Sequence, residues 1–236
     1  MPPVLTATLL VALVGCSTDA AAPAPRTPTE HAEPSAPHRE TATEPTAQSA
    51  APAELQVLER GTGDHALVLL HGYGSNAEDM DGFVRPQDLG DGVRVLFPTA
   101  PNGWRGGGAG RAWFEPPRSR MHEDEARTLR EVENARATIG AMLDALEARG
   151  VPSSHVVLGG FSQGAMMSLD FALNDDRPLA GVAVLSGAPL PTWASRYARR
   201  AGAHVFLSHG RRDDVLPYAD AETLALITIS EPTKPG

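Results

Sequence analysis

The chain has 236 residues and a formal net charge of −9 at pH 7. This length allows one domain of ordinary size, and its acidic balance, with no cluster of Lys and Arg, argues against nucleic acid as a partner. The single cysteine excludes a disulfide within the chain.

The N-terminus has the pattern of an export signal. An apolar run over residues 4–14 leads into Leu13-Val14-Gly15-Cys16, which resembles a bacterial lipobox, where the signal peptide is removed before a cysteine that is then lipidated. The run is too short to span a bilayer. No Lys or Arg precedes it, so an ordinary secretory signal and an incidental apolar N-terminus are the alternatives. We predict a lipoprotein signal peptide over residues 1–15 and a membrane anchor at Cys16, on the secreted side of a bacterial cell envelope.

Residues 16–53 have the composition of a disordered tether. They are mostly Ala, Pro, Thr, Ser and Glu, with no Val, Ile, Leu, Phe, Trp or Tyr. Such a segment cannot bury enough apolar surface to offset the entropy lost on ordering. A tether of this kind would hold a folded domain clear of the membrane. The folded domain is therefore predicted over residues 54–236.

Within this domain, short apolar runs alternate with stretches of helical periodicity. The predicted strands are 66–70, 92–97, 155–160, 179–185 and 203–207. The predicted helices are 123–148, 163–173 and a third that begins after Pro217. Alternation of this kind predicts the α/β class, with a mostly parallel sheet covered by helices on both faces.

Gly160-Phe161-Ser162-Gln163-Gly164 is the strongest functional motif. A G-x-S-x-G sequence alone is weak, but here it follows a predicted strand and opens a predicted helix, as a nucleophile elbow requires. The turn is so tight that the residues two positions either side of the serine must lack bulk. The helix that starts at Gln163 directs its N-terminal dipole toward a developing oxyanion. We therefore predict Ser162 as a nucleophile.

Five segments resemble, in order and spacing, the phospholipase/carboxylesterase family of α/β-hydrolases, which includes acyl-protein thioesterases and small bacterial carboxylesterases. They span about Leu67 to Pro217 and read LLHGYGSNAEDM, FPTAPNG, GRAWFE, GGFSQGAMMSLDFAL and LSHGRRDDVLP. The resemblance implies an α/β-hydrolase fold and a serine hydrolase of carboxylic esters or lysophospholipids that works through an acyl-enzyme. It implies no cofactor.

The resemblance also implies roles for particular residues. The backbone N–H groups of Tyr73 and Gln163 would form the oxyanion hole, while His71 would be structural. In the His-Gly-x-x-Asp pattern the acid of the triad would be Asp213, with its neighbour Asp214 as the alternative, and His209 would hydrogen-bond locally.

The base of the triad is not identified. In the family it follows the acid by a few tens of residues, usually as Gly-His, but none of the eight histidines follows Asp213. One explanation is a truncated or frame-shifted chain that lacks the final strand, the histidine loop and the closing helix. A second is replacement by His122, and a third is a non-catalytic surface lipoprotein that uses the fold for binding. We expect a hydrolase whose activity is impaired in this form.

Two further expectations concern ligands. His and acidic residues do not cluster along the sequence at metal-ligand spacing, so we predict no metal site. Trp104, Trp113 and Phe114 could line an acyl-binding cleft or pack in the core, and the sequence does not choose between these.

Overall fold

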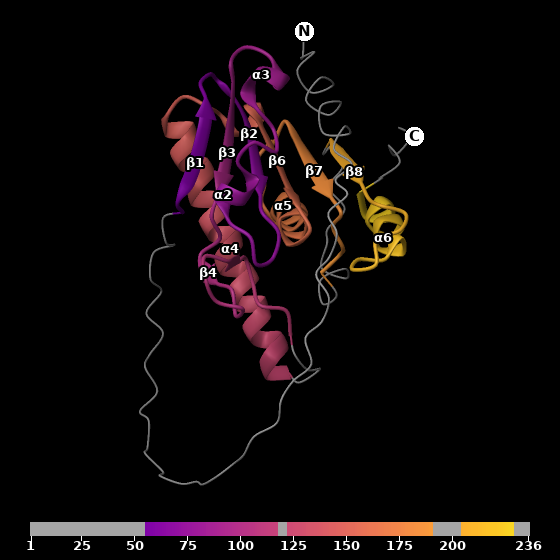
Figure 1. Ribbon diagram of the computed structural model, residues 1–236. Helices are drawn as coiled ribbons and strands as arrows, with labels where there is room; N and C mark the ends of the chain where they lie inside the picture. Colours follow the sequence, from indigo (N-terminus) through magenta and orange to yellow (C-terminus); the bar gives the residue numbers. More distant parts are fainter. Residues whose placement is uncertain (1–54, 118–121, 191–203, 229–236) are drawn as a thin grey trace, which may run out of the picture.

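A computed structural model describes residues 55–117, 122–190 and 204–228 (Figure 1). The predicted signal peptide, the tether and the lipidation site at Cys16 lie outside these residues, as do the last residues of the chain.

The described domain is built on a six-stranded sheet with the order β1-β3-β2-β6-β7-β8. The first strand, β1, runs antiparallel to β3, and the other neighbours pair in parallel. The strands are β1 (Val57–Gly61), β2 (His65–Leu70), β3 (Val93–Pro98), β6 (Val156–Phe161), β7 (Gly181–Leu185) and β8 (Val205–Ser208). The predicted mostly parallel sheet is thus confirmed.

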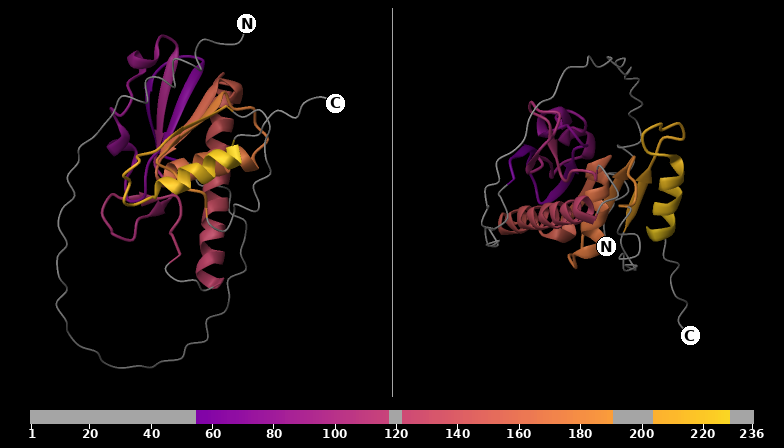
Figure 2. Two further views of the ribbon diagram at one scale, coloured as in Figure 1. Left: turned by 90° about the vertical axis from the view of Figure 1, so that its right-hand side faces the viewer. Right: turned by 90° about the horizontal axis from the view of Figure 1, so that it is seen from below.

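Helices cover both faces of this sheet (Figure 2). The longer ones are α4 (His122–Ala148), α5 (Gln163–Asn174) and α6 (Tyr218–Thr228). The shorter ones are α2 (Ala77–Met80), α3 (Pro86–Leu89) and the 3-10 turn η1 (Ser153–His155), and a small hairpin pairs β4 (Asn102–Gly103) with β5 (Arg111–Ala112).

Alternate residues of β2 divide the core into two layers. Ala66, Val68 and Leu70 pack against α4 and α5, because successive side chains of a strand point to opposite faces. Leu67 and Leu69 pack on the other face, against α2 and α3. A third cluster joins α5 and β7 to Leu224 of α6. No helix in the described part of the chain is long and apolar enough to cross a membrane.

Candidate active site

Ser162 lies on a strained turn between the end of β6 and the start of α5. Its backbone has φ 52° and ψ −115°, a region that costs a non-glycine residue roughly 1–3 kcal/mol. The N–H of Ser162 donates to the carbonyl of Leu185 at 2.9 Å, and its own carbonyl accepts from the N–H of Met166 at 3.1 Å. The turn is therefore held from β7 on one side and from α5 on the other.

The two glycines of the motif are required by close backbone contacts. A Cβ at Gly160 would lie 2.4 Å from the carbonyl carbon of Gly164, and a Cβ at Gly164 would lie 2.2 Å from the carbonyl oxygen of Leu70. Backbone atoms cannot move aside as a side chain can. The glycines thus allow α5 to start directly against the ends of β6 and β2, as the elbow motif predicts.

The loop that follows β2 lies beside Ser162. A Cβ at Gly72 would come 3.5 Å from the Cβ of Ser162 and 3.3 Å from the ring of Phe161. Although about ninety residues separate these segments in sequence, their strands are neighbours, with Leu70 opposite Gly160. Parallel strands end at one edge of the sheet, where α/β proteins place their ligands.

His71 is buried in this loop and serves as a hydrogen-bonding centre. Its Nε2 accepts from the N–H of Ala100 at 3.0 Å, so its Nδ1 carries the proton and donates to the carbonyl of Gly72 at 2.7 Å. The indole N–H of Trp113 donates to the backbone carbonyl of His71 at 3.0 Å. Burial lowers the pKa of His71. With both ring nitrogens engaged, the imidazole orients the loop, which agrees with the expected structural role.

Two backbone N–H groups belong to the residues that follow Ser162 and its neighbour Gly72. Gln163 is the first residue of α5, where N–H groups have no partner within the helix, and Tyr73 follows Gly72 in the adjacent loop. Within the described residues, neither N–H donates to a backbone or side-chain acceptor. Both N–H groups therefore lack a protein acceptor in the described part of the chain, one in the residue after Ser162 and one in the residue after Gly72.

The side chain of Tyr73 fixes the position of its loop. Its hydroxyl donates to Oε2 of Glu115 at 2.7 Å and accepts from Nε of Arg105 at 2.8 Å. Its ring meets the indole of Trp104 edge-on, with centroids 6.2 Å apart. Burial and the neighbouring carboxylate of Glu115 raise the pKa of Tyr73. These contacts anchor the loop of Tyr73 to the loop between β3 and α4.

Asp213 lies in the loop after β8, two strands from Ser162. Its Oδ1 accepts from the N–H groups of Val215 and Leu216, at 2.9 Å each. These bonds fix the carboxylate and leave Oδ2 for another donor. Asp214 is exposed and has no such backbone anchors among the described residues. The difference in anchoring makes Asp213 the better-fixed of the two carboxylates.

The histidine nearest to Asp213 is His209, whose ring hydrogen-bonds locally. Its Nε2 donates to the carbonyl of Leu216 at 2.8 Å and lies 3.7 Å from Oδ2 of Asp213, which is too long for a hydrogen bond. His122 begins α4, and its side chain lies outside what the structure describes. The described side chains therefore do not supply Asp213 with a hydrogen-bonded imidazole.

The aromatic side chains near the site divide into two groups. Trp113 and Phe114 are buried in the core, so the possibility that they line an acyl cleft is wrong for both. Trp104 is half-buried and packs on Gly74 and on the loop after β4. Phe161, which the sequence analysis did not single out, is 46 % exposed next to Ser162. The G-x-S-x-G motif, in which Phe161 directly precedes the serine, is the sequence feature that could have identified this residue.

Comparison of the sequence with known proteins places the chain in a family. Residues 56–231 match the protein-family model that is described as phospholipase/carboxylesterase. The chain is 27 % identical over 171 residues to acyl-protein thioesterase 1 of Eremothecium gossypii, covering 68 % of this chain and 71 % of that one. It is 33 % identical over 167 residues to a protein described as a carboxylesterase from Oryza sativa subsp. japonica, covering 66 % and 71 %.

Solved structures agree with these matches. The crystal structure of esterase PE8 is 29 % identical, with a TM-score of 0.63, and the alignment covers 74 % of this chain and 83 % of that one. Acyl-protein thioesterase 2 of Zea mays, 23 % identical with a TM-score of 0.55 over 74 % and 83 % of the two chains, shares the fold.

Proposed function

The chain belongs to the phospholipase/carboxylesterase family of hydrolases, and we propose that it hydrolyses carboxylic esters with Ser162 as nucleophile. The observation that carries this proposal is the strained backbone of Ser162, held beside Gly72 and two N–H groups without acceptors in the described chain. Small-molecule esters or lysophospholipids are the substrates that the family suggests.

The reaction would proceed in two stages. The hydroxyl oxygen of Ser162 attacks the ester carbonyl carbon, and the electrons of the carbonyl double bond move to its oxygen. The N–H groups of Tyr73 and Gln163 would stabilise this oxyanion, because fixed donors need no reorganisation. Collapse breaks the ester C–O bond, the leaving oxygen takes the proton that the Ser162 hydroxyl gave up to the base on attack, and an acyl-enzyme remains. Water then attacks the acyl group and releases the acid and free Ser162.

Asp213 is proposed as the acid of the triad. Its Oδ1 is held by two backbone N–H groups, so Oδ2 could accept from an imidazole and stabilise the imidazolium formed when Ser162 loses its proton.

The general base of the triad is the catalytic residue that the sequence does not identify. No histidine follows Asp213 in the chain. Without a base, the hydroxyl of Ser162 lacks activation, and the oxyanion hole and substrate binding would leave a residual rate roughly 10³- to 10⁴-fold over water. We therefore propose that the base comes from sequence that continues the domain or from His122. The competing function is binding of an ester-like ligand without turnover, favoured by the lack of a hydrogen-bonded imidazole at Asp213 among the described side chains.

Hydrolysis of p-nitrophenyl esters tests the proposal. The full chain is compared with Ser162→Ala, with the exposed control Ser154→Ala, and with a version extended by the coding sequence downstream of Gly236. Loss of hydrolysis in Ser162→Ala, with Ser154→Ala unchanged, supports the nucleophile. Equal hydrolysis by the chain and Ser162→Ala would contradict it. Activity in the extended version alone assigns the base to that sequence, and inactivity of every version supports the binding function.

The base can be assigned separately. If His122 serves, His122→Gln abolishes the activity of the unextended chain, whereas exposed His204→Gln leaves it unchanged. A chain that keeps its activity in His122→Gln rules this residue out.

The membrane anchor is a second part of the proposal. We propose that Cys16, which lies outside the described residues, is lipidated and ties the domain to the secreted face of a bacterial membrane. In fractionated bacteria, Cys16→Ser is expected to move the protein to the soluble fraction, while Thr18→Ala stays with the membranes. Unchanged membrane association of Cys16→Ser would show that the anchor is not this cysteine.

A further inference from the structure

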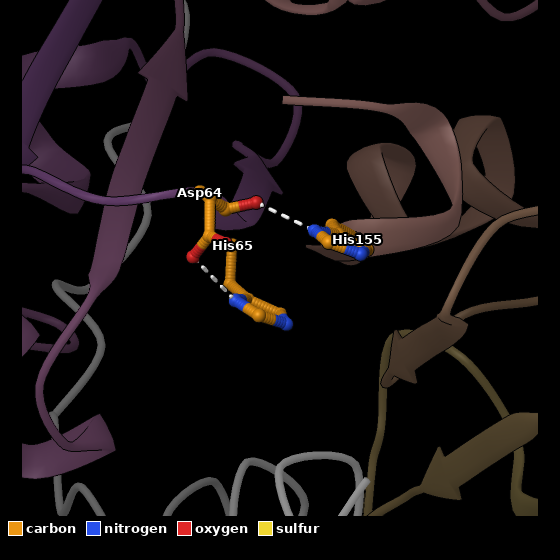
Figure 3. Close-up of side chains that lie close together, drawn as sticks. All are labelled: Asp64, His65 and His155. Atoms are coloured by element: carbon orange, nitrogen blue, oxygen red, sulfur yellow. Dashed lines mark hydrogen bonds and ion pairs between the residues drawn. The ribbon is translucent and has the colours of Figure 1, made fainter. Parts of the chain in front are cut away.

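Asp64, His65 and His155 form a cluster at the end of the sheet opposite Ser162 (Figure 3). His65 is the first residue of β2, and His155 immediately precedes β6. These strands are parallel neighbours with Ala66 opposite Val156, so the preceding residues, His65 and His155, are also brought side by side. The sequence analysis did not find this cluster because ninety residues separate its two histidines.

The two imidazole rings are stacked and parallel. Their centroids lie 4.4 Å apart, and their planes differ by 2°. Each of the three residues offers a ligand atom, and these atoms all lie within 4.8 Å of one another. His65 and His155 are each part exposed, and the side chain of Asp64 is 67 % exposed. The cluster is therefore compact enough for one ion and open to its entry.

Asp64 contacts the Nδ1 atom of both rings. Nδ1 of His65 lies 2.9 Å from Oδ1 of Asp64, and Nδ1 of His155 lies 3.0 Å from the Asp64 carbonyl oxygen. A carbonyl can only accept, so Nδ1 of His155 carries a proton, and a carboxylate likewise favours the proton on Nδ1 of His65. In both neutral rings the lone pair then lies on Nε2. Histidines that bind metals typically donate their other N–H to a carboxylate or carbonyl in this way.

We propose that Asp64, His65 and His155 bind a divalent transition metal ion, with Zn²⁺ as the ion tested. The two Nε2 atoms are the ligands and Asp64 positions them. In Figure 3 the two distal nitrogens lie on the same side of the stacked rings. Because the rings are parallel, zinc binding requires each ring to rotate toward the other until both nitrogens reach one ion at about 2.0–2.1 Å. Water, or the Asp64 carboxylate after rotation, completes the coordination, and neutral imidazole suits zinc better than magnesium or calcium.

The bound metal would join the start of β2 to the start of β6. These two strands end at the loop of Tyr73 and at Ser162, at the far edge of the sheet. An ion that binds only the folded state stabilises it by mass action. The site is therefore expected to raise thermal stability, and its occupancy does not depend on whether Ser162 is catalytically competent.

Zinc binding is measured on the full chain without an affinity tag, by calorimetric titration with ZnCl₂ and by the shift in unfolding temperature. The variants are His65→Gln, His155→Gln and Asp64→Asn, and the matched control is His204→Gln, which alters an exposed histidine outside the cluster. We expect one zinc per chain, at least tenfold weaker binding in each histidine variant, and about 10- to 100-fold weaker binding in Asp64→Asn. His204→Gln should bind as the original chain does.

Imidazole NMR signals of the unsubstituted chain provide a measurement that does not depend on the folding of a variant. Zinc should shift the signals of His65 and His155 and leave that of His204 in place. The proposal is overturned if zinc does not bind, if the variants bind as tightly as the original chain, or if zinc shifts other histidines and not these two.

Discussion

The carboxylate of Asp170, on α5, accepts two hydrogen bonds from the guanidinium of Arg136, on α4, at 2.7 and 3.3 Å. Asp170 is fully buried, whereas the side chain of Arg136 is 22 % exposed. Desolvation raises the pKa of Asp170 to about 6, against the lowering effect of Arg136. The effect of burial on this pKa therefore exceeds the effect of the ion pair. Although the pair joins the two helices, ionisation of Asp170 lowers the stability of the fold.

The stability of the domain should accordingly fall as this carboxyl loses its proton. Between its ordinary pKa of 3.8 and the folded value of about 6, the folded state binds the proton more tightly than the unfolded state does. Relative to Asp170→Asn, the free energy of unfolding should decrease by up to about 3 kcal/mol as pH rises through this window, and then level off. Urea unfolding of both chains from pH 4 to 7.5 measures the difference.

The control for this experiment is Asp144→Asn, which removes an exposed carboxylate that pairs with Arg177. Its stability difference from the original chain should change little over the same pH range. A pH-independent difference between Asp170→Asn and the original chain would contradict the raised pKa.

The glycines of the elbow give a second prediction. Gly164→Ala places a methyl group 2.2 Å from the carbonyl oxygen of Leu70, which cannot yield without moving the strand. We expect a loss of stability of about 1–3 kcal/mol or more, as overpacking of a tight site produces. Gly103→Ala is the control, because a Cβ there meets nothing within 4 Å. Thermal unfolding checks both, and equal melting temperatures would show that the elbow has more space than the structure describes.

The buried side chain of Gln163 gives a third prediction, since it connects the elbow to the loop before α4. Its Oε1 accepts from the N–H of Trp113 at 2.9 Å, and its Nε2 donates to the carbonyl of Phe114 at 2.6 Å. Gln163→Met keeps the length but leaves two buried backbone groups unpaired, which should cost about 2–5 kcal/mol. Urea unfolding measures the loss, with exposed Gln87→Met as the control. A variant as stable as that control would mean that water replaces both bonds.

The elements with strong apolar patterns could be predicted from the sequence. The buried runs at β2, β3, β6 and β7 and the helices α4 and α5 lie within a few residues of their predicted positions. The apolar pattern did not predict β1 (VLERG). This strand is partly exposed at the edge of the sheet, where it pairs antiparallel with β3, and its apolar and polar residues do not alternate strongly. The pattern also failed for α2, whose single turn depends on the Asn76 side chain accepting from the N–H of Asp79.

The site was predictable where it depends on local geometry. The turn at Ser162 follows from adjacent residues, and the structure shows the close contacts that its two glycines permit. The contacts that depend on tertiary structure were not predictable: the bonds of Tyr73 to Glu115 and Arg105 join segments that only the folded sheet brings together. The same is true of His65 and His155, which meet through strand register.

Asp213 and Asp214 provide the last prediction, because neighbouring carboxylates differ in their anchoring. Asp213→Ala removes the acceptor of the N–H groups of Val215 and Leu216 and should destabilise the domain by about 1–2 kcal/mol. Asp213→Asn keeps an acceptor oxygen at the same place, so its stability should lie close to that of the original chain. Asp214→Ala, at an exposed position, should also be close to neutral.

Asp213→Asn and its neighbour Asp214→Asn separate the structural role of Asp213 from its charge. In a version of the chain that hydrolyses esters, Asp213→Asn should lose activity while retaining stability, because an amide cannot stabilise an imidazolium as a carboxylate does. Asp214→Asn should keep both. If Asp214→Asn loses the activity instead, the acid of the triad is Asp214, and the two backbone hydrogen bonds of Asp213 serve only to shape the loop after β8.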